Sequence, residues 1–205
     1  MELHDAILNS AISAFDEYYA ITDKDCWVEH TPEYWYTTKI SIGINKLTDF
    51  VPILETPVKE FREHANAKVG RPSKANRITG KADITLWLNQ EDWIPEAIVE
   101  VKKSWGWAKN TLGEDIDRIC ASLKETKKIE SGYLIVMTDA GGTNEDAAKG
   151  VIESLKAKLE TDIQSHLSNT YNDVSMKSYK LKFATYCKED KAIAAALLFE
   201  FSQKE

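Results

Sequence analysis

The sequence predicts an α/β protein in which helices flank a mixed central sheet. Segments with the apolar spacing of a helix alternate with shorter segments of strand character, as in a layered α/β domain. The continuous apolar run at 133–137 is typical of a strand in the middle of a sheet. With 205 residues, 43% of them hydrophobic, the chain can build one complete core, so we expect a single domain over 1–205.

Two helices are expected first. Residues 3–20 form an extra N-terminal helix with one apolar face, made of Leu3, Ile7, Ala11, Ala14, Phe15 and Tyr18. A second helix runs to about residue 47, with Thr31 as its cap, Pro32 at its first position and Glu33 in its first turn. Its inward stripe contains Tyr36, Ile40, Ile44 and Leu47.

Strands follow these helices. Pro52 and Pro57 disfavour a helix, so an edge strand or an extended segment is expected over 51–61. Residues 83–88 and 97–103 then form two strands joined by a turn-rich connection. Side chains alternate between the two faces of a strand. Three residues of the first strand therefore share a face: Asp83, Thr85 and Trp87. Three residues of the second strand also share a face: Ile98, Glu100 and Lys102.

The second half continues the alternation. A helix is expected from 111 to about 129, with a stripe of Leu112, Ile116, Ile119 and Leu123. The buried strand at 133–137 and a helix from 144 to about 167 come next, and Val151, Ile152, Leu155 and Leu159 should face inward on that helix. Strands at 176–187 and 192–201 form a C-terminal hairpin, with a helix over 192–199 as the alternative.

Three charged residues at strand positions indicate chemistry, because a charge buried in a sheet without a partner is costly. Glu100 and Lys102 share a face, and a hairpin brings Asp83 close to Glu100. Two adjacent carboxylates call for a cation between them, and Mg²⁺ prefers such oxygen ligands. Lys102 would stand beside a metal-bound water and offset developing negative charge. The alternatives are a turn-capping Asp83 and a cross-strand ion pair.

The residues Gly80-Lys81-Ala82-Asp83 and Ile98-Val99-Glu100-Val101-Lys102 resemble the PD-(D/E)xK, or restriction-endonuclease-like, superfamily. The resemblance covers about 31–139, whose expected order of elements matches the family's αβββαβ core. Ala82 stands where many members have proline. The resemblance implies a nuclease that uses Mg²⁺, or alternatively Mn²⁺, with Asp83 and Glu100 as metal ligands and Lys102 assisting the attacking water.

Other acidic residues are weaker candidates. Many members of the family add a carboxylate from the preceding helix, and Glu33 is the candidate here for a third metal ligand. Its alternative role is to interact with the helix dipole. Glu17 and Glu55 are less favoured. Three charged residues on the helix at 111–129 are interpreted as surface ion pairs, with contact to a phosphate or organisation of the site as the alternative: Asp115, Asp117 and Arg118.

The expected nucleic-acid contacts come from a basic segment. The net charge is −7, but 64–81 contains no acidic residue and carries Lys68, Arg71, Lys74, Arg77 and Lys81. These cations and Lys103 would hold a polyanion near Asp83. A solvated loop is the alternative. Trp105 and Trp107 would either stack on bases or anchor a loop over the core.

The sequence thus predicts a Mg²⁺-dependent nuclease that acts on nucleic acid, with DNA favoured, in bacterial or phage restriction, repair or defence. The alternative is a module of the same fold that binds nucleic acid or protein without cleavage. Widely spaced Cys26, Cys120 and Cys187, with no CxxC pair, indicate the cytoplasm, and no membrane span is expected. A homodimer would serve two-strand cleavage, but the oligomeric state is left open.

Overall fold

A computed structural model describes residues 1–24, 27–66, 80–88, 93–103, 105–124 and 128–204, with the backbone alone at 105–111. The strands are β1 (Phe50–Pro57), β2 (Lys81–Leu88), β3 (Ile94–Lys103), β4 (Ser131–Gly141), β5 (Val174–Ser178), β6 (Lys182–Phe183) and β7 (Ala192–Gln203). The helices are α1 (Leu3–Ile21), α2 (Glu33–Leu47), α3 (Val58–His64), α4 (Trp105–Lys124) and α5 (Glu145–Thr170). Together they confirm the α/β class.

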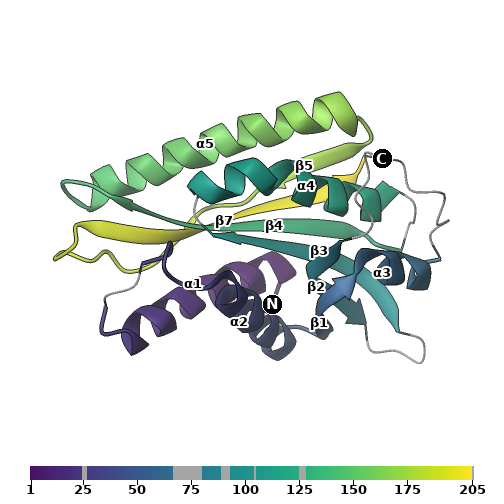
Figure 1. The fold of residues 1–205 in the computed structure, drawn as a ribbon, viewed down its shortest axis with the longest axis horizontal. Helices are drawn as coiled ribbons and strands as arrows, with labels where there is room; N and C mark the ends of the chain where they lie inside the picture. The colour runs from purple at the N-terminus through teal and green to yellow at the C-terminus, as the bar shows by residue number, and fades with distance from the viewer. Residues whose placement is uncertain (25–26, 67–79, 89–92, 104, 125–127, 205) are drawn as a thin grey trace.

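The strands form one mixed seven-stranded sheet between two layers of helices (Figure 1). The strand order is β1-β2-β3-β4-β7-β5, and β6 also pairs with β7. Residues of α1 and α2 pack on one face of the sheet, and residues of α3, α4 and α5 pack on the other. Each face therefore has its own apolar core, and β3 and β4 are buried between the two.

The path of the chain brings the strands with charged residues together. β1, β2 and β3 follow one another as an antiparallel meander. The chain then crosses over through α4 and returns as β4, which runs parallel to β3. This crossover lays α4 across β3. Gly132 on β4 permits close packing there, because a Cβ atom on it would lie 2.3 Å from Ile119 Cγ2 on α4.

The first part of the chain agrees with expectation in most respects. The N-terminal helix, the second helix, the edge strand and the two strands of the hairpin are all present. Thr31 is not the cap that was expected. Its hydroxyl donates to the Trp27 carbonyl, and Pro32 occupies the N-cap position without a side-chain cap. The segment after Pro57 is helix α3 rather than extended chain, because Val58 and Phe61 bury their side chains against the sheet.

In the second half of the chain, the bounds of one helix and the buried face of another differ from the prediction. Helix α4 starts at Trp105, six residues earlier than expected, and ends at Lys124, so Trp105 and Trp107 lie in a helix rather than a loop. The stripe of Leu112, Ile116, Ile119 and Leu123 is buried as expected. On α5, Ile152 and Leu159 are buried, but Val151 is 47% exposed and Leu155 is only partly buried.

The C-terminal segment 192–203 is strand β7, not a helix. It is long enough to pair with β4 along one edge and with both β5 and β6 along the other. The expected partner strand at 176–187 is therefore divided into two short strands. Among the described residues, no helix is both long enough and apolar enough to span a membrane.

The burial pattern of α5 gives a first prediction. Ile152→Ala should lower the free energy of unfolding by about 2–5 kcal/mol, because it opens a cavity in the core under α5. Val151→Ala is the matched control on the exposed face and should change stability by less than about 0.5 kcal/mol. Urea denaturation of both variants measures the difference. Equal losses would show that α5 is rotated relative to the arrangement described.

Candidate active site

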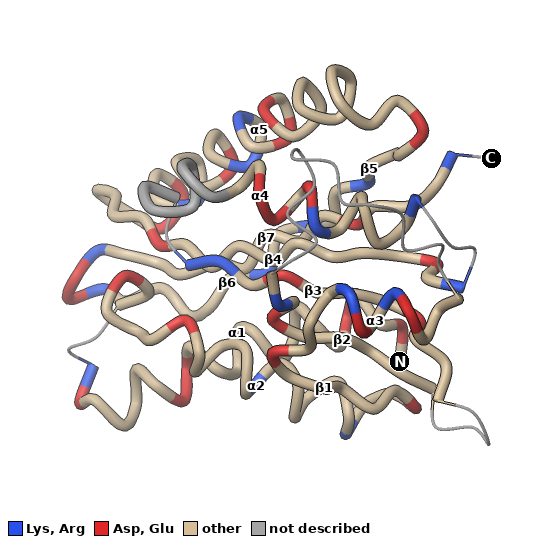
Figure 2. Tube along the Cα trace, turned by 45° about the vertical axis from the view of Figure 1, so that its right-hand side comes forward, with Lys and Arg blue, Asp and Glu red and all other residues tan. Residues whose placement is uncertain are grey.

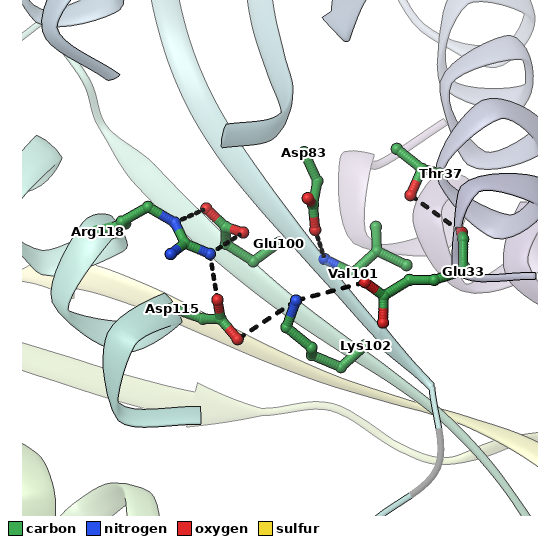
Figure 3. A network of polar contacts seen from close by, with 8 residues as sticks. All are labelled: Glu33, Thr37, Asp83, Glu100, Val101, Lys102, Asp115 and Arg118. Carbon is green, nitrogen blue, oxygen red and sulfur yellow. Dashed lines mark hydrogen bonds and ion pairs between the residues drawn. The ribbon is translucent and has the colours of Figure 1, made fainter. Parts of the chain in front are cut away.

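Asp83, Glu100 and Lys102 come together with three further residues that two helices supply. Asp83 lies near the start of β2, and Glu100 and Lys102 lie near the end of β3. Asp115 and Arg118 approach from α4, and Glu33 from the first turn of α2 (Figure 3). The result is a network of polar contacts at one end of the β2–β3 pair, which Asp83 joins through the backbone N–H of Val101.

Asp83 lies where β2 and β3 stop pairing with each other. The register between these strands ends at Ile84↔Val99, although β2 continues to pair with β1 as far as Lys81. Asp83 Oδ2 accepts a hydrogen bond of 2.7 Å from the Val101 backbone N–H. The carboxylate thus satisfies a β3 donor that would otherwise lack a main-chain partner. This bond fixes the orientation of Asp83 beside Glu100.

Glu100 is fully buried and is held by Arg118. Arg118 Nε donates to Glu100 Oε1 at 2.9 Å, and Arg118 Nη2 donates to Oε2 at 2.8 Å. Such a two-point bond between a guanidinium and a carboxylate is the strongest geometry available to an ion pair. Arg118 Nη2 also bonds to Asp115 Oδ1, one helical turn away. The guanidinium therefore joins two buried carboxylates.

Lys102 lies between Asp115 and Glu33. Its Nζ is 3.5 Å from Asp115 Oδ2 and 3.6 Å from Glu33 Oε1. Figure 3 shows the Lys102 amine between the Arg118 side of the network and Glu33. The Glu33 side chain is 39% exposed, whereas that of Lys102 is 13% exposed. Glu33 thus forms the solvent-facing end of the network.

The network has more carboxylates than cations, and burial is the main cause that raises the pKa values of Glu100 and Asp115. Burial raises the pKa of Glu100 above its usual value and the charges of Asp83 and Asp115 add to the effect, whereas the hydrogen bonds and the charge of Arg118 lower that pKa and keep Glu100 a carboxylate partner of the guanidinium. Burial also raises the pKa of Asp115 to about 6. For Lys102, burial alone would lower the pKa, but Asp115, Asp83 and Glu33 raise it above its usual value. Lys102 is therefore an ammonium at neutral pH, and the site as a whole favours additional positive charge.

The chemistry of the donors suits a hard divalent cation. The carboxylates of the network offer oxygen atoms, which Mg²⁺ prefers, and Mg²⁺ commonly binds through one or two carboxylates and several waters. Asp115 Oδ2 is buried and, among the described residues, accepts no hydrogen bond. In the part of the chain that the structure describes, no three His, Cys, Asp or Glu side chains are already arranged around one metal position. Asp83 and Glu100 are suitable ligands, but Glu100 faces Arg118.

The basic residues predicted to contact nucleic acid are not part of this network. Lys68, Arg71, Lys74 and Arg77 lie outside the described residues. Lys81 is 59% exposed at the start of β2, and its Nζ is 3.9 Å from Glu55 Oε2. Lys103 Nζ donates to the backbone carbonyls of Glu29 and Thr31 at 3.1 and 3.0 Å, so this amine ties β3 to the segment before α2.

Two of the described helices, α3 and α5, carry cations and carboxylates in alternation rather than charges of one sign. Figure 2 shows basic and acidic residues interspersed along α3 and along α5. The described residues of the predicted basic segment therefore do not by themselves make a cationic surface. Electrostatic attraction of a polyanion would depend on cations close to the network.

Asp115 and Arg118 were expected to form surface ion pairs, and that expectation is wrong. Asp115 is 1% exposed, and both residues belong to the network. Asp117 lies apart from them and bonds to His166 on α5 at 2.9 Å. The helical spacing contained a signal, because Asp115 falls three residues after Leu112 and four before Ile119, on the buried stripe of α4.

Comparisons of this chain with protein-family models, with curated proteins and with solved structures found no significant match. The case for any function therefore rests on the network itself and on the fold that holds it.

The role of Asp83 as a hydrogen-bond acceptor gives a second prediction. Asp83→Ala should be less stable than Asp83→Asn by about 1–3 kcal/mol, because alanine leaves the partly buried Val101 N–H without an acceptor. Both variants remove the same negative charge, so their difference isolates the hydrogen bond. Urea denaturation at neutral pH provides the measurement. Equal stability of the two variants would contradict this role of Asp83.

Proposed function

We propose that the protein is a Mg²⁺-dependent nuclease with a restriction-endonuclease-like core that hydrolyses phosphodiester bonds of nucleic acid, with DNA as the favoured substrate. The observation that carries the proposal is the meeting of Asp83, Glu100 and Lys102 where β2 and β3 diverge. A setting in bacterial or phage restriction, repair or defence fits such an activity.

The order of elements supports the nuclease fold. Helix α2, strands β1, β2 and β3, helix α4 and strand β4 follow one another as in the αβββαβ core, with the short α3 inserted after β1. β3 and β4 are parallel neighbours joined through α4. In this arrangement the ExK strand lies inside the sheet, and its polar residues meet the helix that follows it.

Each residue has a distinct role in the proposed hydrolysis. Asp83 and Glu100 would hold Mg²⁺, which when bound supplies a water of lowered pKa and offsets charge on the scissile phosphate. The Val101 N–H keeps Asp83 in place. Because its pKa is raised, Lys102 donates hydrogen bonds rather than accepting a proton, so it orients the attacking water and stabilises developing negative charge. Glu33 contacts Lys102, and we assign it to positioning that amine.

A cleavage assay tests the proposal. Plasmid and linear DNA are incubated with the protein in Mg²⁺, in Mn²⁺ and in EDTA. We expect cleavage in the presence of either metal ion and none in EDTA. Asp83→Asn and Lys102→Ala should each lower the rate by roughly 10²- to 10³-fold, the size expected when a group that stabilises transition-state charge is lost.

Matched controls separate the site from general changes in charge. Asp162→Asn on the exposed side of α5 and Lys124→Ala at the end of α4 remove the same charges outside the network and should leave the rate unchanged. Cleavage that persists in EDTA, or that survives both site substitutions, would rule out the proposed mechanism.

A second candidate function is a binding module of the same fold that does not cleave. The bidentate Glu100–Arg118 pair favours it, because a carboxylate permanently paired with arginine would not serve a metal. Binding of DNA without cleavage in every metal condition, measured with labelled duplex and single strands, would support this alternative.

A further inference from the structure

Arg118 occupies the carboxylate that the proposed metal needs. Both oxygens of Glu100 accept from its guanidinium, at 2.9 and 2.8 Å, and Glu100 has no exposed surface through which a cation could reach it from another side. A guanidinium and a divalent cation on the same carboxylate would repel each other strongly in a buried site, where charges are poorly screened. The pair and the metal are therefore competitors for Glu100.

Asp115 gives Arg118 an alternative partner. It lies three residues earlier on the same helix, and its Oδ1 already accepts from Arg118 Nη2. Its second oxygen, Oδ2, is buried and accepts no hydrogen bond among the described residues, although the Lys102 ammonium lies 3.5 Å away. Arg118 can therefore release Glu100 and remain paired, because its Nη2 already donates to Asp115 Oδ1 while Lys102 faces the other oxygen of Asp115.

We propose that Arg118 is a built-in counter-ion that competes with the divalent cation for Glu100, so that the metal binds only when the guanidinium shifts from Glu100 onto Asp115. This inference rests on the proposed function, since it assumes that Asp83 and Glu100 are the metal ligands. It assigns a role to two residues outside the PD-(D/E)xK motif. Arg118 sets the affinity of the site for metal, and Asp115 receives Arg118 when the metal is bound.

The competition fits the charge balance of the site. Without a metal, Arg118 and Lys102 are the cations that accompany the carboxylates. When a divalent cation enters, the carboxylates of Glu100 and Asp115 each keep a positive partner. An arginine with no second acceptor would instead be left buried and unpaired, which is strongly unfavourable. The Asp115–Arg118 spacing on α4 is thus what permits the exchange.

Binding of Mn²⁺ alone, without nucleic acid, tests the competition by isothermal titration calorimetry. Arg118→Met should bind Mn²⁺ at least about tenfold more tightly than the wild type, since removing a close competing charge is worth more than the 1.4 kcal/mol that corresponds to a factor of ten. Arg118→Lys, which keeps the charge but loses the two-point bond, should fall between them. Lys124→Met removes a cation at the exposed end of α4 and should bind Mn²⁺ as the wild type does.

Thermal unfolding of the same proteins with and without Mn²⁺ gives an independent readout. Arg118→Met leaves Glu100 without its cation and should melt lower than the wild type in EDTA, yet gain more from Mn²⁺. If Arg118→Met does not fold without metal, Arg118→Lys carries the comparison. Mn²⁺ affinity that is unchanged or weaker in both Arg118 variants would overturn the competition. Absence of binding by the wild type and by every variant would instead overturn the metal site of the proposed function, and the competition with it.

Discussion

The bidentate bond between Arg118 and Glu100 is the interaction on which the arrangement of the site depends. A glutamate with no exposed surface in the middle of a sheet needs a positive partner, because an unpaired charge there would cost several kcal/mol. The partner comes from α4, and Gly132 lets that helix approach the sheet closely. The position of α4 on the parallel strands β3 and β4 therefore determines whether Arg118 can reach the buried Glu100.

A second constraint acts at the other side of Glu100. β3 stops pairing with β2 after Val99, and the Asp83 carboxylate accepts the hydrogen bond from the N–H of Val101. Because the strands separate here, Asp83 of β2 lies beside the polar residues of β3, and the Val101 N–H still has a hydrogen-bond acceptor. At the end of β3, Lys103 binds the carbonyls of the segment before α2 and so brings Glu33 within reach of Lys102. The layer of α4 is thereby connected to β3 through Glu100 and Lys102, and the layer of α2 through Lys102 and Lys103.

The sequence predicts the parts of this structure that local periodicity determines. Alternation along 83–88 and 97–103 places Asp83, Glu100 and Lys102, because strand residues two apart share a face. It does not predict Arg118, since the rotation of α4 about its axis depends on packing against the sheet. Helix α3 is too short for a full apolar repeat. The first turns of α4 contain Gly106 and Asn110, which are poor helix formers. The sequence therefore predicts a start for this helix that is later than the observed one. The division of the last hairpin depends on the length of β7, which tertiary pairing decides.

Anomalous diffraction from crystals grown with Mn²⁺ tests the central claim most directly, because it locates the metal without reference to activity. The account predicts a peak between Asp83 and Glu100 at a coordination distance of about 2.1 Å from an oxygen of each, with Arg118 turned onto Asp115. Well-ordered crystals in which Mn²⁺ is absent from this position, and Glu100 still holds Arg118 at millimolar Mn²⁺, would contradict the assignment of these carboxylates as a metal site.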